Sequence, residues 1–242
     1  MLFFLKKPKL HIDAFISEDF KTTYELAPID YAHNFYPDWW RKLPKAPIAA
    51  SAKQNNAKRC ASIIDTYKKG IIIPMWCDYK FKMSSMGQQI SMYANEKAGI
   101  DGHPLIQRQG FRENKIQLKH VSPWYIKSEK NVFFNFNPDF MNLNRDDFQI
   151  IPGMLEFYNQ HSTNINFFLD KKEQEIDILF GDPLVHIVPL TEREIVLTNH
   201  LVTVEEHSKI IKNTKISFGL DYLMRRKYSK DKPKCPFGFG SK

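Results

Sequence analysis

Glu156, Asp78 and His186 are the residues of this sequence whose types suit acid–base chemistry. Glu156 lies in an aromatic block that we expect to form a strand, and a carboxylate that points inward from a strand must find a partner or change its pKa. Arg193 and His186 are the candidate partners. With Asp78 as a second carboxylate these residues would make a hydrolase site, although such a Glu more commonly forms a structural ion pair or faces water.

A second candidate is a non-haem iron site, in which two histidines and one carboxylate leave coordination positions open for oxygen and substrate. His11 and Asp13 are two residues apart, a spacing that places both side chains on one face of a strand. His200 or His186 would supply the remaining ligand. Nothing in the sequence places either histidine beside the first strand, so we expect no metal or other cofactor and keep iron as the alternative.

A third candidate is the aromatic and cationic segment formed by Trp39, Trp40, Arg41 and Lys42. Adjacent Trp side chains stack on bases or sugars in some binding proteins, while flanking cations hold phosphate. Successive residues of a helical turn point about 100° apart, so the alternative is that one Trp packs inward while the other covers an edge. We prefer the packing interpretation, because Trp buries a large area.

The fourth candidate is the C-terminal tail, residues 225–242, which begins with Arg225 and Arg226. It holds seven Lys or Arg and one Asp, a net charge of +6 out of +8 for the chain, while residues 38–59 carry +5 and the rest −3. Basic tails are usually solvated. Phe237 and Phe239 are poor residues for solvation, so we expect one of them to dock on a groove of this chain or of a partner.

The elements that position these residues are indicated most clearly between Val132 and Arg193. The short apolar blocks FFNF, FQII, INFFL, IDILF and LVHIVPL follow one another there, separated by Pro, Gly, Asn and Asp. Such blocks, punctuated about every ten residues, are typical of consecutive strands. We predict an α+β fold dominated by β: an antiparallel β-sandwich or jelly-roll-like barrel with a few short helices. Further strands are expected at residues 10–15, 24–29, 71–83, 88–93 and 115–121.

Two short helices are predicted from their end signals. Residues 59–69 have apolar side chains at helical spacing and are followed by Gly70, a common helix terminator. Thr203 and Glu206 fit a capping box, so a helix should begin at about Val204. Pro74 should mark a strand edge or a bulge, because proline cannot donate to the ladder. Residues 31–60 read as a connection that wraps a single domain, residues 1–224, and residues 225–242 as its tail.

The composition predicts a soluble protein with an ample core. Hydrophobic residues make up 43% of the chain and aromatic residues 14%, which argues against disorder. The start, MLFFLKKPKL, lacks the apolar length of a secretory signal, and no run approaches the ~20 apolar residues of a membrane span. Three cysteines without a Cys-x-x-Cys pair indicate reduced thiols, with Cys77 buried in a strand, and a cytoplasmic location.

Residues 122–193 carry the sequence blocks PWYIKSEKNVFFNFNP, IIPGMLEFYN, INFFL and FGDPLVHIVPLTER. This stretch, under a third of the chain, resembles an uncharacterised family of bacterial and phage proteins known as a domain of unknown function. That family has a central Pro-Leu-Glu-Gly-Ile-Val-Glu block and a closing Gly-Glu-Pro followed by apolar residues, Pro and Arg. The residues at comparable places are Pro152, Gly153, Glu156, Gly181, Pro183, Pro189 and Arg193, and Asp182 departs from the pattern. The resemblance supports the β-rich fold and implies no activity.

The sequence therefore favours a non-enzymatic binding or assembly protein, with a phage as one candidate source, that uses its aromatic and basic segments for contacts. Its partner would be another protein or a second copy reached through the tail; nucleic acid is less well supported and a membrane is not expected. The location would be the host cytoplasm, or the virion for a phage protein. The alternative is an enzyme with its site in the mouth of the barrel, either iron-dependent or carboxylate-based.

Overall fold

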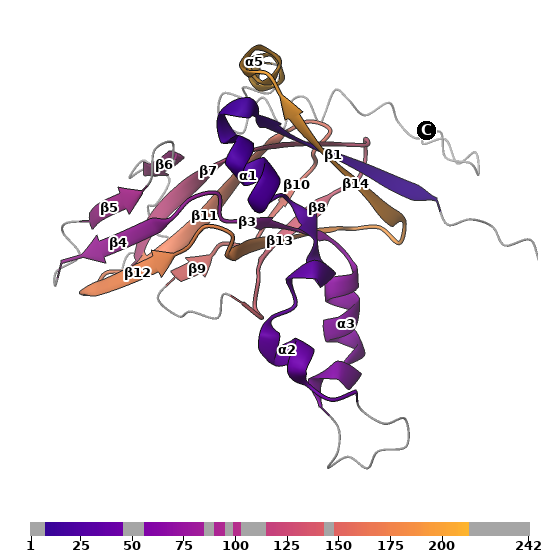
Figure 1. The fold of residues 1–242 in the computed structure, drawn as a ribbon, viewed down its shortest axis with the longest axis horizontal. Coiled ribbons are helices and arrows are strands. Elements are labelled where there is room, and N and C mark those ends of the chain that lie inside the picture. The colour runs from indigo at the N-terminus through magenta and orange to yellow at the C-terminus, as the bar shows by residue number, and fades with distance from the viewer. Residues whose placement is uncertain are drawn as a thin grey trace, which may run out of the picture.

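The structure is a computed structural model that describes residues 8–45, 56–84, 90–94, 99–102, 115–142 and 148–212. Strands hold 48% of the structure and short helices 23%, which confirms the predicted β-dominated α+β class (Figure 1). The strands in these ranges form three sheets, and none of these sheets closes into a barrel. The architecture is therefore that of an open, sandwich-like fold.

The largest sheet, sheet A, has six strands in the order β14-β1-β7-β11-β9, with β6 also beside β7. Its members are β14 (Glu194–Val202), β1 (Lys9–Ser17), β7 (Lys115–Ser128), β11 (Ser162–Asp170), β9 (Phe148–Ile150) and β6 (Gly99–Gly102). All pairs are antiparallel except β1 and β14, which run parallel with Phe15 opposite His200. The first and last described strands of the chain thus lie side by side.

Sheet B has the order β10-β8-β13-β3-β2, and sheet C the order β12-β4-β5. Sheet B contains β10 (Gly153–Leu155), β8 (Phe134–Pro138), β13 (Pro183–Pro189), β3 (Ile71–Pro74) and β2 (Asp30–Tyr31), and sheet C contains β12 (Gln174–Ile178), β4 (Tyr79–Met83) and β5 (Ile90–Ala94). Pro74 lies opposite an irregularity in the pairing of β3 with β13, between Pro183 and Val185, which fits the predicted bulge. Strand β3 is an inner strand between β13 and β2, although its pairing with β2 ends before Pro74.

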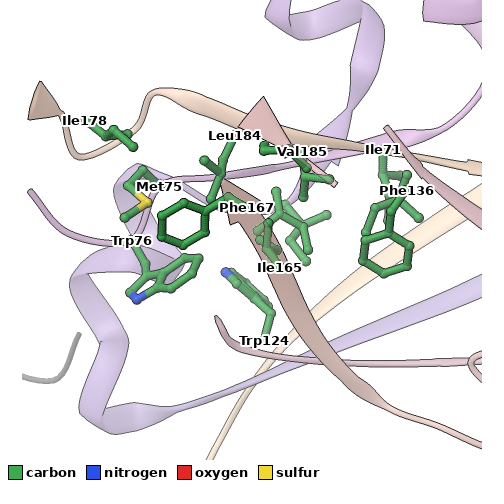
Figure 2. Close-up of a cluster of buried hydrophobic side chains, with 14 of the residues drawn as sticks. Ile71, Met75, Trp76, Trp124, Phe136, Ile165, Phe167, Ile178, Leu184 and Val185 are labelled. Carbon is green, nitrogen blue, oxygen red and sulfur yellow. The ribbon is translucent and has the colours of Figure 1, made fainter. Parts of the chain in front are cut away.

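One hydrophobic core joins the three sheets. Along β1 and β4 buried and accessible side chains alternate, as expected for strands with one face in the core. Figure 2 shows Trp76, Trp124 and Phe167 meeting in this core, with Phe136 beside Ile71 at the other side of the cluster. In β3, by contrast, every residue is buried, because the outer face of sheet B is also covered.

The cover is a helical extension, which we define as the described residues between β2 and β3. It contains α2 (Asp38–Lys42) and α3 (Ala61–Lys68), which project together from the sheets in Figure 1. A second apolar cluster of Ala32, Trp40, Tyr67, Ile72 and Met141 attaches the extension to sheet B. The described parts of the predicted connection, residues 31–60, contribute short helices to this extension.

Both predicted helix signals are confirmed. Helix α3 is followed by Gly70 with φ of +96°. Helix α5 (Val204–Lys212) begins after Thr203, whose amide donates to the Glu206 carboxylate at 3.1 Å while the Glu206 amide donates to the Thr203 hydroxyl at 3.3 Å. None of the described helices is long and apolar enough to cross a membrane.

Two local predictions in the first 84 residues are wrong. Residues 24–29 do not form a strand, because α1 (Lys21–Leu26) continues from a 3-10 turn that Ser17 caps. Thr23 and Ala27 are buried one helical turn apart, while Leu26 is 71% exposed. The buried positions of this segment therefore follow the spacing of a helix and not the alternation of a strand. Cys77 is buried as expected, but in the bend between β3 and β4.

Candidate functional site

A groove with a cavity volume of about 610 Å³ lies between α3 and the outer face of sheet B; we call it the α3 groove. Helix α3 lines it with Ser62 and Thr66, β8 with Asn135 and Asn137, and β13 with His186. Cavities of this size are typical of small-molecule sites. The groove collects uncharged polar side chains from three elements that are distant in the sequence.

Strand β8 places its two amides through simple alternation. Phe134 and Phe136 point into the core, so Asn135 and Asn137 point to the opposite, outer face of sheet B. The Asn135 side-chain amide donates to the Asn137 side-chain carbonyl at 3.1 Å. This bond fixes the two amides relative to each other and leaves them half-buried beside the groove.

His186 lies at the floor of the groove, on a strand that is buried on both faces. Its Nε2 is 2.9 Å from the Lys69 carbonyl oxygen, and because a carbonyl only accepts, Nε2 carries the proton. Burial lowers the pKa of His186, against smaller opposing effects of this bond and of Asp139. Gly70 makes the close approach possible, since a Cβ there would lie 2.5 Å from the Ile187 carbonyl oxygen.

Beneath the groove, Tyr67 of α3 donates its hydroxyl to the carboxylate of Asp139, and both side chains are fully buried. Asp139 also accepts from the Asn142 side-chain amide at 2.7 Å and from the Met141 amide at 3.3 Å. Burial, together with the bond to Asp139, raises the pKa of the Tyr67 hydroxyl. This network ties the wall of the groove to the segment after β8.

The rim of the groove combines an ion pair with apolar side chains. Lys69 Nζ lies 2.8 Å from Glu192, and the exposed Phe140 and Leu190 stand at the opening. Phe140 is 47% exposed and its ring meets that of Tyr67 edge-on at 5.7 Å. An aromatic ring held in this way offers a flat apolar surface next to the amides of β8.

The structure does not bring Glu156, Asp78 and His186 together. Glu156 follows β10 in a turn instead of lying in a strand, and it is buried. Its carboxylate accepts from the Asn131 amide at 2.6 Å and from the Asn159 side chain at 2.7 Å. Asn131 has φ of +64°, which places it in a tight turn. Glu156 therefore stabilises this turn by accepting from its backbone amide.

The predicted partner of Glu156 is also engaged elsewhere. Arg193 Nη1 lies 2.6 Å from Glu129, and this bond lowers the pKa of the Glu129 carboxyl. Asp78 accepts from the Phe180 amide at 2.7 Å in the turn after β3, where it lines a different cavity beside Cys77. Burial raises the pKa of the Cys77 thiol to about 11. The three predicted catalytic residues therefore belong to separate hydrogen-bond networks.

The iron candidate is assembled in part. The parallel pairing of β1 and β14 brings Asp13 Oδ1 within 2.8 Å of His200 Nε2, and the His200 ring stacks on Phe15 at 4.6 Å. His11 lies two residues before Asp13, with an exposed side chain. Within the described ranges, no three His, Cys, Asp or Glu side chains are grouped closely enough to hold a metal ion.

The aromatic and cationic segment follows the packing interpretation. Trp40 is 5% exposed and packs in the helical extension, while Trp39 is 50% exposed and meets it edge-on. Arg41 donates to the carbonyls of Tyr36 and Asn34 at 2.8 and 2.7 Å, so its guanidinium has a structural role. Lys42 is exposed, 3.9 Å from Asp38. The tail candidates Arg225, Arg226, Phe237 and Phe239 lie outside the described residues.

Sequence reasoning identified His186 of the groove but missed Tyr67, Asp139 and the two amides. The alternation in FNFNP was a usable signal for Asn135 and Asn137, since it places both on one face. The pairing of Tyr67 with Asp139 joins residues 72 positions apart, and no local pattern marks it. Comparison of the chain with family models and with curated proteins finds no match.

Proposed function

We propose that this protein is a non-catalytic binding protein that holds a neutral, hydroxyl-rich ring, such as a sugar unit, in the α3 groove. The observation that supports this most directly is the placement of Asn135 and Asn137 beside the exposed ring of Phe140. A carboxamide both donates and accepts, as does a ligand hydroxyl. The apolar face of a sugar ring packs on an aromatic side chain, so the two features suit the same ligand.

The charges at the groove support a neutral ligand. Asp65 and Lys69 are its charged lining residues, and Lys69 is paired with Glu192. The buried groups beneath the groove favour binding over hydrolysis. Asp139 and Tyr67 are fully buried and hydrogen-bonded to each other, and Nε2 of His186 is occupied by a backbone carbonyl. A general acid or base must reach the proton that it transfers.

The test is retention of the intact protein on an array of immobilised neutral oligosaccharides, followed by titration with the sugar that retains it. We expect Asn137→Ala and Phe140→Ala each to weaken binding about tenfold or more, through loss of a hydrogen bond or a stacking surface. Trp39→Ala is the matched control, because Trp39 is equally exposed but does not line the groove. If no sugar retains the protein, or if both groove variants bind normally, the proposal is wrong.

The wider setting belongs to the same proposal. We place the protein among the uncharacterised bacterial and phage proteins that it resembles, as a binding or assembly protein of the host cytoplasm or the virion. Cys60 and Cys77, the cysteines in the described ranges, are free thiols, which suits a reducing compartment. Contacts of the basic tail with a protein partner or a second copy are the remaining part of the proposal.

A further inference from the structure

One edge of β11 is only partly paired. On one side β11 runs along β7. On the other side β9 pairs only with Phe167–Leu169 of β11. One further hydrogen bond of 2.8 Å, from the Ile151 amide to the Asn166 carbonyl, extends this pairing. In an antiparallel strand alternate residues present their N–H and C=O to the same side, so Asn164 points these groups to the same edge as Asn166. Among the described residues, the pairing of β9 with β11 stops at Asn166 and does not reach Asn164.

A hollow with a volume of about 360 Å³ lies beside this edge; we call it the β11 slot. Phe136, Ile150 and Ile165 supply apolar side chains to it, and its other wall is β10, the outermost strand of sheet B. The slot therefore lies between the part of β11 that β9 leaves uncovered and the outermost strand of sheet B. None of its lining residues in the described ranges is charged.

We propose that the β11 slot accepts an extended, uncharged peptide segment of a partner protein, which adds to β11 as a further strand. An open edge that presents a backbone donor and acceptor is a template for another strand. Side chains alternate along such a strand, so every second one would face the apolar floor. The uncharged lining selects against Lys, Arg, Asp and Glu at those positions, because burying an unpaired charge there is costly. This site is separate from the α3 groove and does not depend on it.

Two positions allow the slot to be blocked in different ways. Asn164→Pro removes the backbone donor, whereas Asn164→Ala keeps the backbone and removes only the side chain. Gly153 lines the slot, and a Cβ there would meet nothing within 4 Å, so Gly153→Val adds bulk without a clash inside the fold. If Asn164→Pro fails to fold, Gly153→Val still tests the proposal.

The probe is a blocked peptide of alternating threonine and valine, with a peptide of alternating threonine and glutamate as its control. We expect the first peptide to slow hydrogen exchange of the Asn164 amide at least several-fold, and to bind Asn164→Ala as it binds the original protein. Binding should fall about tenfold or more in Asn164→Pro and Gly153→Val, with β7 amides still protected as evidence of folding.

Several results would overturn the proposal. An Asn164 amide that exchanges at the same rate with and without the peptide would do so, and so would equal binding of the glutamate peptide. Protection of Asn164 that is present without peptide and disappears on dilution would identify a second copy of this chain as the occupant, in place of a partner.

Discussion

His120 is buried in the core, where β7 faces sheet C, and neither of its ring nitrogens has a hydrogen-bond partner among the described residues. The Phe167 ring stacks on the imidazole at 4.4 Å, and the Tyr79 ring meets it edge-on at 4.6 Å. Burial lowers the pKa of His120 to about 3, because nothing replaces the hydration of the charged form. His120 therefore serves as a neutral aromatic core residue.

This burial makes stability depend on pH. Between pH 6.5 and pH 3 the unfolded chain protonates His120 and the folded chain does not, so the free energy of unfolding falls as pH falls through this range. Each such group contributes up to about 1.4 kcal/mol per pH unit. We expect His120→Phe to reduce this slope in urea unfolding measured from pH 7 to pH 4. His11→Gln, at an exposed position, should keep it, and an unchanged slope in His120→Phe would contradict the assignment.

At the scale of single residues, the sequence predicts which polar side chains are buried better than it predicts what they do. His186 was identifiable because it is a polar residue inside an apolar block. In the structure it is indeed buried and hydrogen-bonded. Glu156 carries the same signal, yet it stabilises the turn at Asn131. A polar residue inside an apolar block therefore indicates burial for both side chains. Whether the buried residue lines a groove or stabilises a turn depends on which residues the fold places next to it.

Among the elements, α3 forms a wall of the groove and depends on a buried polar contact for its position. Its capping groups are weak, since the Cys60 side chain makes no capping bond, and the helix is only eight residues long. Isolated helices of this length are unstable in water. Tyr67, donating to Asp139, and the apolar cluster around Trp40 therefore hold α3 against sheet B.

We expect Tyr67→Phe to lower the free energy of unfolding by about 1–3 kcal/mol, because Asp139 would lose a donor in a buried site. The loosening should be greatest in the helical extension, so hydrogen exchange of α3 amides should accelerate more than that of β7 amides. Tyr158→Phe is the matched control, because that side chain is 47% exposed. Equal exchange of α3 in Tyr67→Phe and the original protein would show that the apolar cluster alone suffices.

Elements with strong local signals were predictable from the sequence. The Phe- and Ile-rich blocks after Val132 became β8, β9, β11, β12 and β13, because turn residues separate them. The capping box opened α5 at the expected residue. Helix α1 was not found, since its buried positions are few and its tyrosine and threonines suit strands equally well.

At the scale of the whole molecule, pairings between distant segments were not predictable. Strand β14 lies parallel to β1 across more than 180 residues, and this contact alone brings Asp13 to His200. Local periodicity records which face of a strand is buried but does not record its neighbour. The α3 groove and the β11 slot both arise where separate sheets or elements meet, so each required the fold.

The charge distribution of the whole chain leads to the last prediction. The tail contributes +6 of the net +8, but Phe237 and Phe239 within it suit an apolar contact, and salt weakens ionic contacts while leaving apolar ones in place. We expect sedimentation equilibrium to show self-association that persists at 0.5 M salt. Phe237→Ser combined with Phe239→Ser should abolish it, whereas Arg225→Gln with Arg226→Gln should not. If salt disrupts the association, or if only the arginine variant loses it, the tail would instead recognise an acidic surface or phosphate.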